Sequence, residues 1–302
     1  MKVSGFTIVR NGVAFDYPFV ESLRSLAPLV DELVVNVGDC DDGTLEAVEA
    51  VRTEFPSVQW VVFRSVWPLN DPEKKRSGLI LSEQTNLALA QCTGDWCIYL
   101  QADEVFHEED RAKIIETLKS IDQDKRVEGI VLNYRHLYGS FDVEQYSRSA
   151  YRREVRIVRN QIGIKSVGDA QSFRAADGSK PRVVLSCARV FHYGWVRDPK
   201  AMKDKTFFLD QLYHGSASES ELEVGIPKTK DNYRYKRFVG LRLFKETHPQ
   251  VMSERISKKN WTWDFKNSSL ELHWSDAKKL VLDSLESLTG IRFFEYKSYR
   301  FL

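Results

Sequence analysis

"WCIYLQADE", residues 96–104, gives the clearest indication of the fold, because a short apolar run leads directly into a polar tip. The first four residues are apolar on both faces of an extended strand, as expected where helices cover both sides of a parallel sheet. Ligands bind such sheets at the carboxyl ends of the strands, where helix N-termini and free backbone amides converge. We therefore expect Asp103 and Glu104 to lie at a ligand-binding rim.

The residues before and after this stretch repeat the same pattern. Strand-like apolar runs alternate with segments of helical period, which is typical of an α/β protein with a mostly parallel central sheet. Strands are predicted at 3–9, 32–37, 58–63, 96–100 and 129–134, and helices at 18–30, 44–55, 79–92 and 108–121.

The second half of the chain is less regular. Residues 135–197 contain short β-prone pieces separated by Gly and Asp, so we expect antiparallel or edge strands there. Helices are predicted at 199–215 and 275–290, with a mobile polar loop at 216–225 between them. We therefore predict a domain over 1–215 and a mainly helical C-terminal extension over 216–302, packed on it.

Composition excludes several classes of protein. The chain has 302 residues, of which 42% are hydrophobic and 12% aromatic, which is typical of a globular protein. Its 44 basic and 43 acidic residues leave a net charge of +1, so no global field attracts nucleic acid. The four cysteines lack CxxC spacing, which favours reduced thiols in the cytoplasm. We expect no transmembrane segment, because no apolar run approaches about 18 residues and no basic-then-apolar leader precedes the first strand.

The polar residues after the predicted strands favour a divalent cation. The chain has no GxGxxG after its first strand and no GxxxxGK[ST] motif, so another device must hold a phosphate. Mg²⁺ and Mn²⁺ take one or two carboxylates while phosphate oxygens and waters complete the shell. Asp103 is our candidate ligand, with Glu104 orienting a ligand or water. The alternative is that both acids start the helix that follows, as favourable charges at its positive end.

Several motifs in order resemble family 2 glycosyltransferases of GT-A fold. These are "VSGFTIVRNG" (3–12), "GDCDDGT" (38–44) and "NLALAQCTGDWCIYLQADE" (86–104). The segments 166–173 and 189–205 resemble the acceptor-side and His-containing segments of the bacterial branch that builds surface polysaccharides and lipopolysaccharide cores. The resemblance covers residues 3–105 well and extends more weakly to about residue 215.

The resemblance implies a site for a nucleotide diphosphate sugar. Asn11 and the backbone of Val9 and Arg10 would border the nucleotide, and Asp39 and Asp42 would bind its base and ribose. Gln84 and Asn86 would lie near the base or the diphosphate, while Gln101, Ala102 and Asp103 fall on the Asp-x-Asp motif. Gln101 departs from that motif, because its neutral amide gives a cation less charge than a carboxylate would.

Catalytic roles follow from the same resemblance. Family members invert configuration with an Asp or Glu base in the segment that matches "SVGDAQSF", so Asp169 is the candidate base. Its alternative is a turn residue beside Gly168. His192 would complete the metal shell or contact the diphosphate, although a single His at a strand end is more often structural. Arg197, Lys203 and Lys205 could face phosphates, but a charged run on a helix is usually solvated, so they are left out of the site.

Two basic segments have open interpretations. Arg148, Arg152, Arg153, Arg156 and Arg159 could bind an anionic acceptor, or they could protect an exposed strand edge by charge. The C-terminal "IRFFEYKSYRFL" could lie at a membrane interface or a dimer contact, or could pack on the body. The oligomeric state does not follow from the sequence.

The sequence thus predicts an inverting glycosyltransferase that uses Mn²⁺ or Mg²⁺ and moves a hexose from a nucleotide sugar to a saccharide or lipid-linked glycan. UDP-sugar is the expected donor because uridine is the most frequent base in the family. Two alternatives have the same type of sheet. One is a nucleotide-sugar-binding protein with little or no turnover, favoured by Gln101, and the other is a sugar nucleotidyltransferase.

Overall fold

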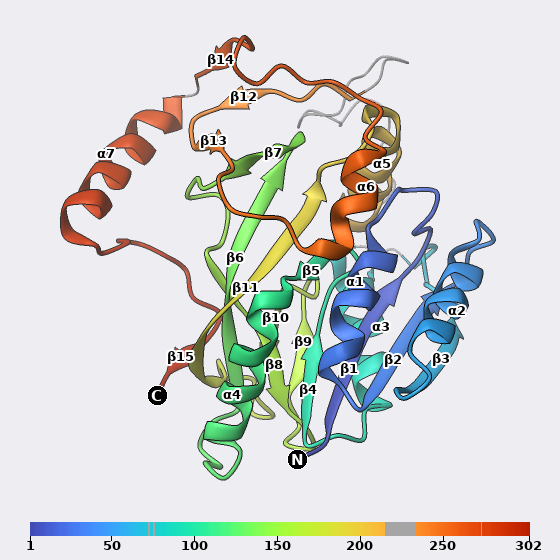
Figure 1. The fold of residues 1–302 in the computed structure, drawn as a ribbon. Helices are drawn as coiled ribbons and strands as arrows, with labels where there is room; N and C mark the ends of the chain where they lie inside the picture. Colours follow the sequence, from blue (N-terminus) through green and yellow to red (C-terminus); the bar gives the residue numbers. More distant parts are fainter. Residues whose placement is uncertain (72, 75, 215–232, 273) are drawn as a thin grey trace.

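The computed structural model describes residues 1–71, 73–74, 76–214, 233–272 and 274–302. They form a mixed α/β fold around one curled central sheet (Figure 1). The predicted loop at 216–225 and the predicted boundary at 215/216 lie outside the described residues.

The first half of the chain builds the parallel part of the sheet. Its strands are β1 (Val3–Val9), β2 (Glu32–Gly38), β3 (Gln59–Ser65) and β4 (Trp96–Tyr99). They lie in the order β3-β2-β1-β4, and each neighbouring pair is parallel. The carboxyl ends of β1 and β4 therefore point to the same edge, as the sequence predicts.

The second half continues the sheet with mixed directions. Its longer strands are β6 (Gly129–Tyr138), β7 (Ser140–Gln145), β8 (Arg153–Arg159) and β11 (Arg182–Trp195). β8 inserts antiparallel between β4 and β6, while β11 runs parallel to β6. The short β5 (Glu104–Phe106) pairs with β11, and β9 (Lys165–Val167) and β10 (Ser172–Arg174) form a separate hairpin.

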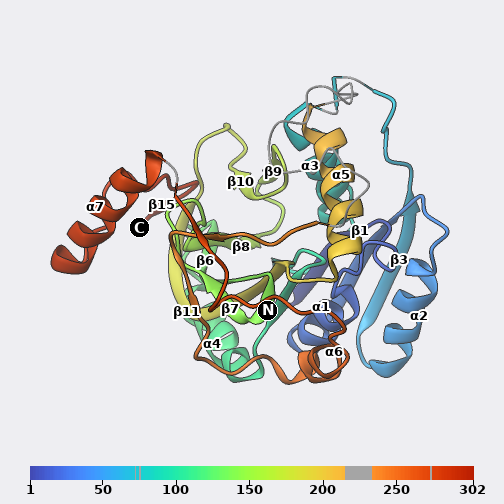
Figure 2. The same ribbon diagram turned by 90° about the horizontal axis from the view of Figure 1, so that it is seen from above.

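Helices cover both faces of the sheet, which confirms the predicted fold class. One face is covered by α1 (Phe19–Leu26), α2 (Thr44–Glu54) and α4 (Arg111–Ile121). The other is covered by α3 (Leu79–Ala90) and α5 (Pro199–His214), as the view from above shows (Figure 2). Short 3-10 turns occur at Ala27–Leu29, Arg76–Gly78, Glu108–Asp110 and Gln250–Met252.

The described C-terminal part mixes helices with very short strands. These elements are β12 (Arg237–Phe238), β13 (Leu241–Leu243), α6 (Ser253–Ser257), β14 (Leu270–Glu271), α7 (Trp274–Thr289) and β15 (Arg300–Phe301). β13 pairs with β7 and β15 with β11, so both join the central sheet. α7 lies at the side of the molecule, away from the sheet (Figure 1).

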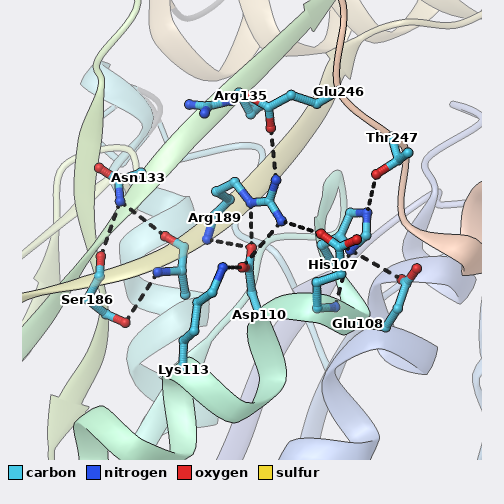
Figure 3. Close-up of polar contacts among 12 residues, drawn as sticks. His107, Glu108, Asp110, Lys113, Asn133, Arg135, Ser186, Arg189, Glu246 and Thr247 are labelled. Carbon is cyan, nitrogen blue, oxygen red and sulfur yellow. Dashed lines mark hydrogen bonds and ion pairs between the residues drawn. The ribbon is translucent and has the colours of Figure 1, made fainter.

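An ion cluster fastens the chain after β13 to the sheet. Arg189 on β11 donates to the buried Asp110 (2.7 Å) and to Glu246 (2.9 Å), and Lys113 also donates to Asp110 (2.5 Å) (Figure 3). His107 bonds to Thr247 beside them (3.0 Å). Each of these side chains has a polar partner, so we interpret the cluster as a structural link between the chain after β13 and the sheet.

The adjacent acids Asp103 and Glu104 point to different places. Glu104 is fully buried and accepts two hydrogen bonds from the equally buried Arg156 (2.9 and 2.8 Å) and one from Tyr134 (2.7 Å). Its other contact is the backbone amide of Gln101 (3.1 Å), so it fixes the loop that carries Asp103. Glu104 therefore supports the site from inside the sheet.

We expect Arg156→Met to lower the free energy of unfolding by about 3–5 kcal/mol, because it leaves the buried Glu104 carboxylate without its partner. Urea denaturation measures the change. The matched control is Arg24→Met, which breaks the half-exposed pair with Glu54 (side chains 35% and 38% exposed) and should cost less than about 1 kcal/mol. Equal losses in the two variants would contradict a central role for the buried pair.

Among the described residues, no helix is long and apolar enough to cross a membrane.

Candidate active site

A cavity of about 280 Å³ lies at the carboxyl ends of β1 and β4, under α5. Aromatic side chains make much of its wall. Its polar lining consists of Arg10, Gln101, Asp103, Asp169, Gln171, His192 and Lys205. A charged set in a largely apolar hollow is typical of a small-molecule site.

The cavity brings together all three predicted metal-binding and catalytic residues and four of the nine predicted nucleotide-binding residues. Seven predicted residues line it: Val9, Arg10, Gln101, Ala102, Asp103, Asp169 and His192. They come from β1, the loop after β4, the β9–β10 turn and β11, which are far apart in sequence. Their predicted roles remain predictions.

Five predicted nucleotide-binding residues do not line this cavity: Asn11, Asp39, Asp42, Gln84 and Asn86. Asp39 lies at its margin, where it accepts from Arg10 (3.1 Å) and from the Trp67 amide (3.0 Å). Asn11, next to Arg10, has a positive φ of 52° at the end of β1.

The other three are occupied by contacts within the protein. Asp42 accepts from the amide and hydroxyl of Thr44 (3.2 and 2.6 Å), at the start of α2. Gln84 is buried and accepts from Asn36 (3.1 Å). Asn86 exchanges two hydrogen bonds with the backbone of Ser166 (2.9 and 2.8 Å), which fixes the β9–β10 hairpin to α3. These contacts give each residue a structural duty.

Asp103 faces cations inside the cavity. Lys205 on α5 donates to its Oδ2 atom (3.2 Å) and to the carbonyl of Gly194 (2.7 Å). Burial alone would raise the pKa of Asp103, but the positive charges of Lys205 and Arg197 reverse the effect and lower it to about 2. Asp103 is therefore ionised at neutral pH.

Sequence reasoning left Lys205 and Arg197 out of the site, yet both are buried. Lys205 is 5% exposed and Arg197 is 0% exposed, with Arg197 donating to the Phe15 carbonyl (2.6 Å). Burial and the charge of Arg197 lower the pKa of Lys205 to about 7, although Asp103 opposes the shift. One signal was present in the sequence, because Lys205 falls between Met202 and Leu212 on the buried stripe of α5.

A chain of two histidines sets the tautomer of His192. The Nε2 atom of His136 lies 2.7 Å from the Tyr151 carbonyl, which can only accept, so His136 carries its proton there. Burial lowers the pKa of His136 to about 3, so the ring is neutral and its Nδ1 is an acceptor. The Nδ1 atom of His192, 3.1 Å away, must then be the donor. Neutral His192 therefore presents an Nε2 lone pair to the cavity.

This lone pair faces a carboxylate oxygen. The Nε2 atom of His192 lies 3.7 Å from Oδ1 of Asp103, and both atoms are acceptors. Gly194 leaves them room, because a Cβ there would lie 2.5 Å from His192 Nε2 and 2.9 Å from Asp103 Oδ2. Two acceptors at this spacing fit a shared cation or a shared hydrogen-bond donor.

The two residues thus fit a divalent cation as an incomplete shell. The described residues hold no group of three or more His, Cys, Asp or Glu side chains suited to a metal ion. Mg²⁺ and Mn²⁺ commonly take only one or two protein ligands and complete their shell with phosphate and water. Asp103 and His192 would hold such an ion only together with a phosphate ligand.

We expect His136→Ala to weaken Mn²⁺ binding in the presence of UDP by about 10–100-fold, because His192 loses the partner that orients its ring. Electron paramagnetic resonance of free Mn²⁺ measures the affinity, and ¹⁵N shifts of the His192 ring in the metal-free protein report its tautomer. His136→Gln is the matched variant, since its amide oxygen can still accept from Nδ1. Unchanged affinity and tautomer in His136→Ala would show that His136 has no positioning role.

Asp169 is the second carboxylate of the cavity. Its Oδ2 atom accepts from Tyr213 of α5 (3.0 Å) and its Oδ1 atom from the Gln171 amide (3.2 Å). It lies in the turn between β9 and β10, where Gly168 and Ala170 both have positive φ (61° and 62°). Asp169 is therefore a turn residue and also a lining residue of the cavity, so its two predicted interpretations are compatible.

A scan of family models and a search of curated proteins found no match. Among solved structures, S. aureus TarS is 16% identical, with 73% of this chain and 41% of TarS covered and a TM-score of 0.38. TarS 1–349 in complex with UDP-GlcNAc is 14% identical, with 73% of this chain and 69% of that chain covered and a TM-score of 0.39. The mannosyltransferase PcManGT from Pyrobaculum calidifontis, in complex with GDP-Man and Mn²⁺, is 20% identical. The match covers 44% of this chain and 36% of that chain, with a TM-score of 0.31. Similarity at this level does not assign a family.

Proposed function

We propose that this protein is an inverting glycosyltransferase of GT-A fold, which moves a hexose from a nucleotide diphosphate sugar to a glycan hydroxyl. One observation carries the proposal. A single cavity at the ends of parallel strands holds the Asp103–His192 acceptor pair, the Lys205 cation and a second carboxylate, Asp169. These residues can bind the diphosphate of the donor and accept the proton of the acceptor hydroxyl.

The reaction assigns a separate task to each part of the cavity. The acceptor oxygen forms a bond to the anomeric carbon while the bond from that carbon to the diphosphate oxygen breaks. The leaving nucleoside diphosphate keeps the bonding electrons, and the hydroxyl proton goes to the carboxylate of Asp169. Attack from the side opposite the leaving group inverts the configuration at that carbon.

The leaving diphosphate requires positive charge. Lys205 supplies it directly, and the charge of Arg197 lies behind it. A Mn²⁺ or Mg²⁺ ion held by Asp103 and His192 would supply further charge neutralisation when bound. Gln101 lines the cavity and donates only weakly to the Ala170 carbonyl (3.4 Å), so its amide is free to contact a ribose hydroxyl.

Donor and biological setting complete the proposal. The donor is a UDP-sugar, as is usual in the resembling family, and the acceptor belongs to surface polysaccharide or lipopolysaccharide-core synthesis. Residues 1–215 form the catalytic unit and 216–302 the extension, with the protein working in the cytoplasm or against the inner face of the membrane.

We expect UDP-glucose to bind with uptake of a fraction of a proton near pH 7. Lys205 has a pKa of about 7 in the free protein, and a bound diphosphate favours its charged form. Because the complex then holds more protons than the free protein, affinity should fall as pH rises above about 7. Calorimetry in two buffers of different ionisation enthalpy measures the uptake. Lys205→Met should show none, and equal uptake in that variant would assign the proton elsewhere.

Product analysis tests the proposed function. The protein is incubated with Mn²⁺ and UDP-, GDP- and dTDP-hexoses, and the released compounds are identified by chromatography. A glycosyltransferase releases the nucleoside diphosphate and free or transferred sugar. In a parallel incubation with nucleoside triphosphate and hexose 1-phosphate, release of pyrophosphate would instead indicate a nucleotidyltransferase. Donor binding without any release would indicate a binding protein, the alternative that Gln101 favours.

A further inference from the structure

A second cavity of about 360 Å³ adjoins the first. Three side chains line both cavities: Tyr151, His192 and Trp195. The rest of its wall comes from β6, the end of β7 with the loop that follows, Tyr233 and β12. A molecule bound in the second cavity would therefore border the first cavity at His192.

The second cavity is aromatic. Its wall includes Tyr138, Tyr151, Trp195, Tyr233 and Phe238. Several of these rings support one another, since Tyr138 packs on Phe238 (centroids 5.1 Å apart) and Trp195 on Tyr233 (6.4 Å). The polar members between the rings are Gln145 and Ser149.

The described residues that line the second cavity carry no net charge. None of the ten lining residues is Asp, Glu, Lys or Arg. Burial lowers the pKa values of His136 and His192, so both rings are neutral at pH 7. The first cavity, in contrast, holds Asp103, Asp169 and Lys205.

The nearby arginines are committed elsewhere. Arg148 and Arg152 bind acids of α7, Asp283 (2.9 Å) and Glu286 (2.9 Å). Arg156 is paired with Glu104, and Arg159 donates to backbone carbonyls after α4. Arg153 donates to Asn133 (3.1 Å), and none of the five arginines of this run lines the second cavity.

We infer that the second cavity binds the acceptor, and that the part of the acceptor held there is an uncharged saccharide. This inference rests on the proposed function. A sugar ring has an apolar C–H face that packs on aromatic rings, and hydroxyls that need polar partners. The amide nitrogen of Gln145 already donates to Ser147 (3.0 Å) and Ser149 (3.2 Å), so the side-chain oxygen of Gln145 is the acceptor offered to a sugar hydroxyl. A phosphorylated or carboxylated sugar would lose its hydration there without gaining a cation. The hydroxyl to be glycosylated would enter the first cavity beside His192.

The inference is tested on the full chain saturated with UDP and Mn²⁺. The probes are the uncharged methyl glucoside, methyl galactoside, maltose, cellobiose, lactose and N,N′-diacetylchitobiose, with glucose 6-phosphate and glucuronate as anionic counterparts. Saturation-transfer NMR measures binding, and a crystal soaked with the best probe locates it. We expect at least one uncharged probe in the second cavity, and weaker binding of its anionic counterpart.

Two variants and a control assign the site. Neither Tyr233 nor Gln145 lines the first cavity, so Tyr233→Ala and Gln145→Ala should each weaken the uncharged probe at least tenfold while UDP affinity stays unchanged. Tyr146→Ala removes an exposed tyrosine that does not line the second cavity and should leave probe binding unchanged. Two variants are used because Tyr233→Ala removes a partly buried ring, whereas Gln145→Ala should fold normally.

The outcomes are distinct. If UDP fails to bind the wild-type protein, the proposed function itself falls. Three other results overturn only the assignment of the second cavity. They are UDP binding without binding of any uncharged probe, uncharged probes that bind both variants as well as the wild-type protein, and anionic sugars that bind better than uncharged ones.

Discussion

Asp103→Asn is expected to reduce turnover of the donor by about 10²–10³-fold, the size of effect seen when one preorganised electrostatic contact to a developing charge is lost. The carboxylate is ionised, faces Lys205 at 3.2 Å and shares the cavity with the His192 lone pair. The asparagine amide keeps the shape of the aspartate side chain but removes the negative charge that would hold a cation. Initial rates of UDP release at saturating donor measure the effect.

The fold should tolerate this change. Lys205 keeps its bond to the Gly194 carbonyl (2.7 Å) and, with a pKa of about 7, can lose its proton when its partner is neutral. We therefore expect almost the same melting temperature. Asp41→Asn is the matched control, since the Asp41 side chain is fully exposed in the loop before α2. Near-normal turnover in Asp103→Asn would remove Asp103 from the mechanism.

Asp169→Asn is expected to reduce transfer by about 10²–10⁴-fold, the range typical of losing a general base. Donor binding should be spared, because the amide cannot take the acceptor proton but still accepts from Tyr213. The measurement combines single-turnover transfer rates with UDP affinity by calorimetry, so that chemistry is separated from binding.

Tyr213→Phe provides the control for Asp169. It removes the hydrogen bond to Oδ2 and leaves the carboxylate in place, so we expect a much smaller loss of transfer. If Asp169→Asn loses UDP affinity in parallel with turnover, the residue belongs to the donor site and the base lies elsewhere.

The sequence predicts the framework of this fold well for a physical reason. The run at 3–9 is predicted and observed as β1, and all seven of its residues are buried. An apolar run that continues on both faces specifies a central strand without reference to the rest of the chain. β8 is different, because its place between β4 and β6 depends on pairings between distant segments.

The site divides in the same way. Asp103 and Asp169 can be proposed because motifs and strand ends fix their surroundings locally. Lys205 cannot, since a charged residue on a helix is usually solvated and Lys205 is buried only by contacts with distant segments, such as Tyr17, Asp103 and Trp195. The tautomer of His192 depends on His136, 56 residues earlier in the chain, and follows only from the paired register of β6 and β11.

The most direct test of the account is a crystal structure of the full chain with UDP and Mn²⁺, with anomalous data collected at the manganese edge. We expect an anomalous peak in contact with Asp103 and His192, and the diphosphate beside Lys205 in the first cavity. A structure with UDP bound elsewhere, or with manganese away from Asp103, would contradict it.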